Sequence, residues 1–295
     1  WAAEGFVVQG LSRDPSVVAK MRRHLQAAGK FGRVSVGPFD GTRLPYVDSL
    51  VNVLVISEPG RLRAEEVVRV LVPGGTAFVE AASEVPGLPT APIESLEGWK
   101  AYRKPWPPQI DEWTHYLHGP DNNAVANDEA VGPPRSMQWV GSPRWSRNHH
   151  KLCSISAVVT ARGRLFCIMD DAPAANINLP GQWMLVARDA FNGVELWRKP
   201  MASWAWHGIR FRSGPPQLPR LLVACEDRVY APLGLNAPVS AIDASTGKTL
   251  DTFADTAGAE EIILADGVLL VLKGAPVAEQ ATKHASFSDR FRMPN

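Results

Sequence analysis

The chain has 295 residues, enough for one large or two ordinary domains, and 45% of them are hydrophobic. Its formal net charge of +1 gives no electrostatic basis for binding nucleic acid, and no apolar run reaches the ~18 residues that a membrane span requires. Glycine and proline, with 24 and 25 residues, are enriched, which favours a turn-rich β architecture for part of the chain. The three cysteines form no CxxC pair and leave the compartment open.

The first eighty residues alternate strand and helix patterns. Asp14 and Pro15 form the start signal of a helix that ends at Gly29, and a second helix is predicted over 64–71. Residues 51–56 (V-N-V-L-V-I) are nearly all apolar, as in a central parallel strand. This alternation predicts a parallel sheet with right-handed crossovers.

Four stretches in this region resemble class I S-adenosylmethionine-dependent methyltransferases: G-L-S-R-D-P at 10–15, F-D-G-T-R-L-P-Y-V-D at 39–48, V-N-V-L-V at 51–55 and E-V-V-R-V-L-V-P-G-G at 66–75. The resemblance implies a partial α/β Rossmann-like methyltransferase domain over residues 1–83, whose possible cofactor is S-adenosylmethionine. The glycine-rich cofactor loop of that family would lie before Trp1, so the domain is expected to be truncated.

The resemblance also implies four cofactor-binding positions, Gly10, Ser12, Asp40 and Gly41. Ser12 stands where the family has the acidic residue that holds the ribose hydroxyls, and Asp40 matches the position that lines the adenine pocket. Asn52 replaces a usual Asp. The alternative is a degenerate fold that binds no cofactor.

Residues 84–130 are rich in proline and aromatic residues and are predicted to be a linker. Within them His115 and His118 are three residues apart and would share one face of a helix, as metal ligands can. The alternative is a surface segment whose aromatic rings pack against the following domain. No metal site is predicted.

From residue 137 onwards the sequence alternates strand, turn and strand. Five hairpins are predicted, and two consecutive hairpins make a four-stranded antiparallel unit of the kind that forms a propeller blade. The predicted hairpins cover residues 155–169, 187–197, 221–233, 241–253 and 261–272.

The second and fourth hairpins share the pattern A-x-D-A-x-x-G, in which Asp starts the turn and Gly supplies a positive φ. With Trp197, this pattern resembles the repeat of quinoprotein-type β-propellers, which implies an incomplete all-β propeller over residues 131–295. There Trp197 and Trp139 are expected to dock sheet against sheet. The whole chain resembles planctomycete-type bacterial fusions of methyltransferase-like and quinoprotein-like modules.

Pyrroloquinoline quinone (PQQ) and calcium are not predicted as ligands, because the chain has no Cys-Cys pair and Asp170, Asp171, Asn176 and Asn178 are explained as loop residues. We therefore expect a non-catalytic binding or scaffold protein that could bind a protein partner through its propeller loops. The alternatives are a methyltransferase fragment and a quinone-dependent alcohol dehydrogenase-like enzyme. The propeller resemblance favours an exported or periplasmic location. A partial propeller would also expose two sheet faces and is expected to associate.

Overall fold

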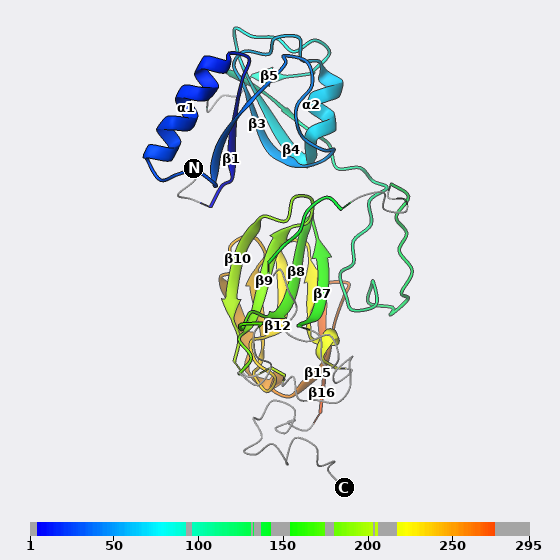
Figure 1. The fold of residues 1–295 in the computed structure, drawn as a ribbon. Coiled ribbons are helices and arrows are strands. Elements are labelled where there is room, and N and C mark those ends of the chain that lie inside the picture. Colours follow the sequence, from blue (N-terminus) through cyan, green and yellow to red (C-terminus); the bar gives the residue numbers. More distant parts are fainter. Residues whose placement is uncertain are drawn as a thin grey trace. The chain divides into compact units, whose positions relative to one another are not determined.

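The computed structural model divides the chain into two compact units, residues 1–108 and 109–295, which are described separately (Figure 1). The structure describes residues 5–92, 96–130, 132, 137–142, 154–174, 180–202, 204–205 and 217–274.

The first unit begins with a parallel pair of strands and a helix. Strand β1 (Val8–Ser12) pairs with β2 (Val34–Pro38), and helix α1 (Pro15–Ala27) connects them and contacts both. The carboxylate of Asp14 accepts the backbone N–H of Ser16 at 2.7 Å, so Asp14 caps the helix as predicted.

A separate four-stranded sheet forms the rest of this unit. Its order is β3 (Val51–Ile56), β4 (Leu71–Glu80), β6 (Trp99–Arg103) and β5 (Ala91–Pro92). Strand β4 is parallel to β3 and antiparallel to β6, and helix α2 (Ala64–Val70) leads directly into β4. The core of the unit is apolar and includes Leu44, Ile56, Leu62, Val67, Val70, Leu71, Ala77, Val79, Val85 and Leu88.

The expected Rossmann-like α/β methyltransferase fold is wrong. Such a fold needs one continuous, mostly parallel sheet covered by helices on both faces. The described residues contain only two α-helices, and the strands of the first unit separate into a two-stranded parallel sheet and a mixed four-stranded sheet. Apolar composition also misled the prediction for β3, because Val53 and Val55 are 45% and 46% exposed.

Residues 84–130, predicted as a linker, are shared between the two units. Val85 and Leu88 are buried in the core of the first unit, and β6 pairs along the whole of its length with β4. From Gln109 the chain belongs to the second unit.

The second unit consists of antiparallel hairpins at the five predicted places. Strands β7 to β10 form the first sheet in chain order, β11 to β14 form the second sheet, and β15 and β16 form a third hairpin. Their bounds are β7 (Ile155–Ala161), β8 (Arg164–Asp170), β9 (Trp183–Asp189), β10 (Glu195–Pro200), β11 (Val223–Cys225), β12 (Arg228–Pro232), β13 (Val239–Asp243), β14 (Thr249–Phe253), β15 (Ala259–Ala265) and β16 (Val268–Lys273).

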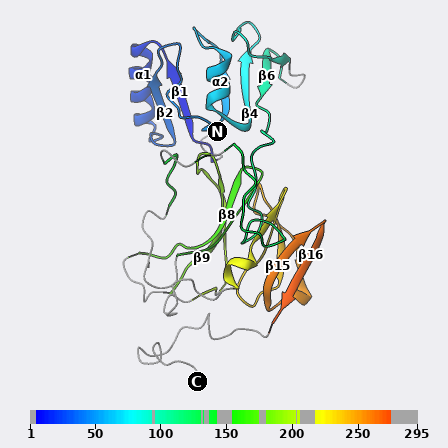
Figure 2. The ribbon, with the colours of Figure 1, turned by 90° about the vertical axis from the view of Figure 1, so that its right-hand side faces the viewer.

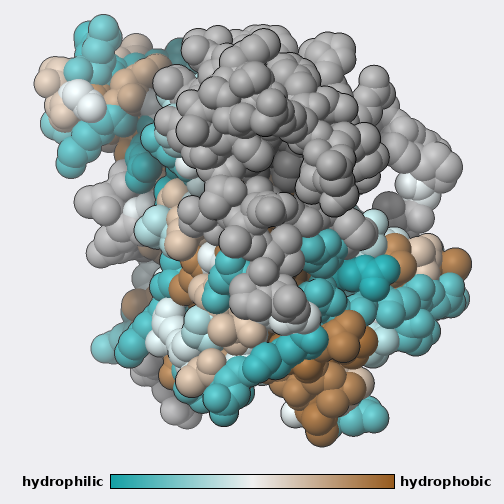
Figure 3. All heavy atoms as spheres, turned by 90° about the horizontal axis from the view of Figure 1, so that it is seen from below, coloured by the Kyte–Doolittle hydropathy of each residue, from teal (hydrophilic) through white to brown (hydrophobic). Residues whose placement is uncertain are grey.

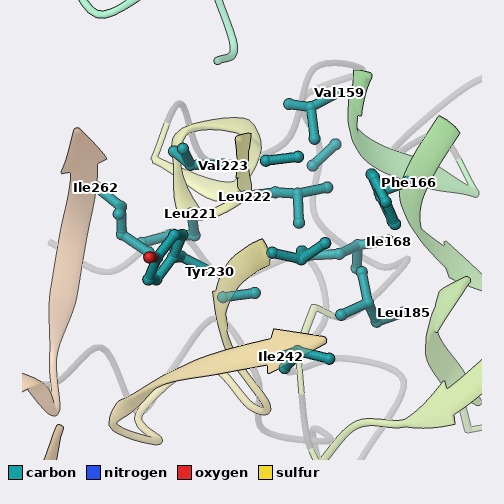
Figure 4. Packing of buried hydrophobic residues seen from close by; sticks show 14 of the residues in the cluster. Val159, Phe166, Ile168, Leu185, Leu221, Leu222, Val223, Tyr230, Ile242 and Ile262 are labelled. Atoms are coloured by element: carbon teal, nitrogen blue, oxygen red, sulfur yellow. The ribbon is translucent and has the colours of Figure 1, made fainter. Parts of the chain in front are cut away.

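The first strands of the three sheets lie next to one another. Strand β11 contacts both β7 and β15, and the short helix η2 (Leu218–Leu221) contacts β7 and β15 as well. Figure 2 shows η2 beside the β15–β16 hairpin. Apolar side chains from all three sheets point into one shared core (Figure 4), including Val159, Phe166, Ile168, Leu185, Val223, Tyr230, Ile242 and Ile262.

The hairpin β15–β16 has two different sides. Leu269 and Val271 pack against the shared core, whereas Val268, Leu270 and Leu272 are each more than half exposed. The alternation follows from the period of two along a strand. A hydrophobic patch is visible at the lower edge of the molecule when it is seen from below (Figure 3).

The described part of the chain is therefore mostly β structure in several small sheets, which is compatible with a propeller-like fold. No helix in the described part of the chain has the length and apolar composition that a membrane crossing requires.

Candidate functional site

The predicted cofactor residues lie around β1 and β2. Because these strands are parallel and Ser12 is paired with Pro38, Ser12 lies at the same sheet edge as Asp40 and Gly41, which follow β2. Gly10 lies inside β1, paired with Val36. Three of the four predicted residues thus gather at one edge, and the fourth remains in the strand.

The polar atoms at this edge shape their own loops. One carboxylate oxygen of Asp40 accepts the backbone N–H groups of Thr42 and Arg43 at 2.7 and 2.9 Å, and these bonds hold the pKa of Asp40 below its usual range. Gly41 has a φ of +88°, as a tight turn requires. The Ser12 hydroxyl accepts the N–H of Asp14 at 3.2 Å, at the start of α1. The hydrogen bonds of Asp40 and Ser12 therefore give these two residues a structural role in their turns.

The two histidines of the aromatic segment do not share a ligand site. The backbone N–H of Leu264 donates to Nε2 of His115 at 3.0 Å, whereas Nε2 of His118 lies 2.7 Å from the carboxylate of Asp111. Among the described residues, no group of three or more His, Cys, Asp and Glu side chains is placed to hold a metal ion.

Three consecutive residues, 113–115, instead join the three sheets, and we call them the 113–115 staple. Trp113 exchanges two hydrogen bonds with Thr160 of β7: its N–H donates to Oγ1 at 2.8 Å, and its carbonyl accepts the N–H at 2.7 Å. The carbonyl of Thr114 accepts the N–H of Ala224 in β11 at 3.0 Å. The imidazole of His115 accepts the N–H of Leu264 in β15.

The staple binds the same position of three repeated hairpins. Thr160, Ala224 and Leu264 each stand two residues before a non-glycine residue with positive φ. Those residues are Arg162, Glu226 and Asp266, with φ of 49°, 53° and 50°. Equivalent turn geometry therefore presents equivalent backbone N–H groups to consecutive residues of one segment.

We call this end of the second unit the turn face. It comprises the staple and the turns at 161–164, 189–194, 225–228, 243–248 and 265–268. Within each four-stranded sheet the two turns are linked, because the N–H of Ala190 donates to the carbonyl of Gly163 at 2.8 Å and the N–H of Ala244 donates to that of Asp227 at 3.0 Å.

Charged side chains connect the turns of the first and second sheets. Arg164 donates to the carboxylate of Asp227 and to the Ser245 hydroxyl, both at 2.8 Å. Arg162 pairs with Glu226 and Asp227, and its backbone N–H donates to the carboxylate of Glu112 in the segment before the staple. Backbone and side-chain bonds thus cross-link neighbouring turns.

The aspartates of the repeated turn pattern cap their own turns. Asp189 accepts the N–H groups of Phe191 and Asn192 at 2.8 and 3.0 Å, and Asp243 accepts those of Ser245 and Thr246 at 3.0 and 2.8 Å. The pattern is therefore structural at both places, as predicted.

A tryptophan docks on each of these turns. The ring of Trp139 lies so close to Gly193 that a Cβ there would be 2.3 Å from it, and its Nε1 donates to the carbonyl of Ala190 at 2.9 Å. Trp197 of the first sheet repeats the contact on Gly247 of the second, with 2.7 Å for the Cβ and 2.9 Å from Nε1 to the Ala244 carbonyl. These contacts confirm the docking roles predicted for Trp197 and Trp139.

The residues weighed as calcium ligands have other partners. Asp170 is fully buried and accepts the N–H groups of Ala172 and Gln182 at 3.0 and 2.7 Å. Asp171 forms an ion pair with Arg198. Asn176 and Asn178 lie outside the described residues.

Sequence reasoning missed the staple and the charged network between turns. The dense aromatic and histidine composition around residue 113 was the available signal, but it did not indicate which backbone groups these residues bind. No protein-family model and no curated protein matches the chain.

Proposed function

We propose that the second unit is a propeller-type binding module of the quinoprotein repeat class, and that a protein partner binds its turn face. The observation that supports this proposal is the staple, in which residues 113–115 bond to equivalent positions of three sheets. A surface that is rigid before binding loses little conformational entropy when a partner docks.

The side chains of the turn face favour a partner with charges of both signs. Arg162, Glu226 and Asp227 have more than half of their side-chain surface exposed although they form ion pairs. Arg228 and Asp266 are also exposed. Alternating charges on neighbouring turns fix the register of a charged partner and exclude one with the opposite pattern.

The test compares charge changes at the two ends of the second unit. Arg228→Glu and Asp266→Asn alter the turn face, and Asn tolerates the positive φ of position 266. Asp255→Asn is the matched control, because Asp255 is exposed on the connection between β14 and β15, at the opposite end of these strands.

Proteins retained by the immobilised wild-type chain are identified, purified and titrated against each variant. We expect the turn-face variants to weaken binding about tenfold or more, and Asp255→Asn to bind like the wild type. Equal binding by all variants would exclude the turn face as the binding surface.

A second measurement addresses chemistry. Calorimetric titration of the chain with S-adenosylmethionine, or with pyrroloquinoline quinone and Ca²⁺, is expected to give no saturable heat. Saturable micromolar binding of either ligand would contradict a scaffold function.

A further inference from the structure

His115 differs from the other two residues of the 113–115 staple in how it binds its sheet. The bonds to β7 and β11 use backbone carbonyls of the staple and the threonine hydroxyl of β7, none of which titrates near neutral pH. The bond to β15 uses an imidazole nitrogen. Histidine is the side chain whose ordinary pKa lies between pH 5 and 8.

The geometry defines the protonation state of this imidazole. The N–H of Leu264 can only donate, so Nε2 of His115 must be the unprotonated nitrogen. The proton is then on Nδ1, which lies 2.8 Å from Oγ1 of Thr114. That hydroxyl in turn donates to the carbonyl of His118 at 3.3 Å. The bound imidazole is therefore neutral, and its tautomer is determined by a chain of hydrogen bonds.

Protonation removes the acceptor. An imidazolium carries N–H groups on both nitrogens, so Nε2 would face the N–H of Leu264 as a second donor. His115 is only 5% exposed, and a charge formed there would also be buried. Both effects favour a conformation in which the imidazolium leaves the staple.

We propose that His115 is a pH-sensitive latch, whose protonation releases the β15–β16 hairpin from the 113–115 staple while β7 and β11 stay bound.

The elements packed against His115 carry charges of both signs. The charged and titratable groups on these elements are Asp111, Glu112, Tyr116, His118 and Asp121 on its own segment, Arg162 and Arg164 on the β7–β8 turn, Cys225, Glu226, Asp227 and Arg228 around the β11–β12 turn, and Glu260, Glu261, Asp266 and Lys273 on β15–β16. Burial lowers the pKa of His115, and the charge of Asp121 opposes this with a smaller effect.

The direction of the pH dependence follows from this lowered pKa. The released histidine has an ordinary pKa of about 6.5 and binds protons more readily than the latched one. The latch is therefore stable above pH ~6.5 and weakens as the pH falls, by up to about tenfold in the open fraction per pH unit.

Amide hydrogen exchange, measured by NMR on the full chain, tests this directly. Protection of the Thr160, Ala224 and Leu264 amides is measured between pH 7.5 and 5.0, relative to an unstructured amide at the same pH. We expect protection of Leu264 to fall by about tenfold or more at pH 5.0, while Thr160 and Ala224 change less than about twofold. Equal losses at all three amides, or constant protection of Leu264, would overturn the proposal.

Two variants assign the effect to His115. In His115→Gln the amide oxygen can accept the Leu264 N–H and does not titrate, so protection of Leu264 should become independent of pH. In His118→Gln the pH dependence should persist. If the variants show the reverse, the latch belongs to His118.

A spectroscopic readout on the wild type remains available even if a variant does not fold. Nitrogen-15 correlation spectra of His115 at pH 7.5 should show a proton on Nδ1 and none on Nε2. A protonated Nε2 at that pH would refute the proposal.

Discussion

The docking of Trp197 on Gly247 allows the sharpest prediction, because the chain contains a matched control. Gly247 has a φ of +72° and a Cβ there would lie 2.7 Å from the Trp197 ring. Gly267 has a φ of +77°, and a Cβ there would meet nothing within 4 Å. Alanine at either position therefore pays the same backbone penalty, but only at 247 must a ring move.

The magnitude follows from the contacts that the ring would lose. The backbone penalty of alanine at positive φ is about 1 kcal/mol, so Gly267→Ala should destabilise the second unit by that amount. Displacement of Trp197 breaks its hydrogen bond to Ala244, about 1 kcal/mol, and disturbs its contact with the Phe166 ring 6.0 Å away, about another 1 kcal/mol. Gly247→Ala should therefore destabilise by about 3 kcal/mol.

The assay is urea unfolding followed by tryptophan fluorescence, with stability compared at constant m value. A double-mutant cycle completes it: in a Trp197→Ala background the ring is absent, and Gly247→Ala should cost only about 1 kcal/mol. Equal effects of Gly247→Ala and Gly267→Ala, or an unchanged effect in the Trp197→Ala background, would refute the docking argument.

Three further predictions concern buried or partly buried polar groups. Asp170→Ala leaves two backbone N–H groups without this acceptor and should destabilise the second unit by about 2–4 kcal/mol. Asp170→Asn should destabilise it less, because it keeps an amide oxygen as acceptor. Equal losses of stability in the two variants would contradict the reasoning. The Arg69 guanidinium beside Glu66 lowers the pKa of the Glu66 carboxyl. The stabilising contribution of this carboxylate is therefore present above pH ~4.3 and is lost as the pH falls. Glu66→Gln should accordingly reduce the acid sensitivity of the melting temperature. Burial raises the pKa of the Cys167 thiol to about 11. In a variant whose other cysteines are replaced by serine, this thiol should react with a thiol reagent at pH 8 about 100-fold more slowly in the native chain than in the urea-unfolded chain. Comparable rates in the two states would contradict its burial.

The hairpins of the second unit could be predicted because their signals are local. Alternation with a period of two defines the strands, and Gly163, Gly193, Gly247 and Gly267 all have the positive φ that their turns require. The docking of Trp197 was also predictable, because the repeated pattern places a glycine at the same position of both turns, Gly193 and Gly247, and a tryptophan follows the first of these turns.

In the first unit, local sequence signals predicted the two α-helices but not the pairing of the strands. Helices α1 and α2 lie at the predicted places, since caps and apolar periodicity are short-range features. The sheet was predicted wrongly, because the pairing partner of a strand is decided elsewhere in the chain. Strand β6 comes from the segment predicted as a linker, and it pairs with β4.

For the predicted cofactor site, too, the position of the residues and the bonds of their polar atoms must be distinguished. The parallel pairing of β1 and β2 brings Ser12 and Asp40 to one edge. The hydrogen bonds inside each loop then used the same polar atoms to form turns, which a comparison of residue types does not show.

The amino-acid sequence by itself determined the hairpins of the second unit, their turns and the docking of Trp197 on the neighbouring sheet. Only the tertiary structure decided how residues 113–115 act, because their partners are 47, 110 and 149 residues away along the chain. Apart from the hydroxyl of Thr160, those partners are backbone N–H groups, which every residue except proline carries. Such bonds form only where three strands present free N–H groups side by side, and no pattern of residue types specifies that arrangement.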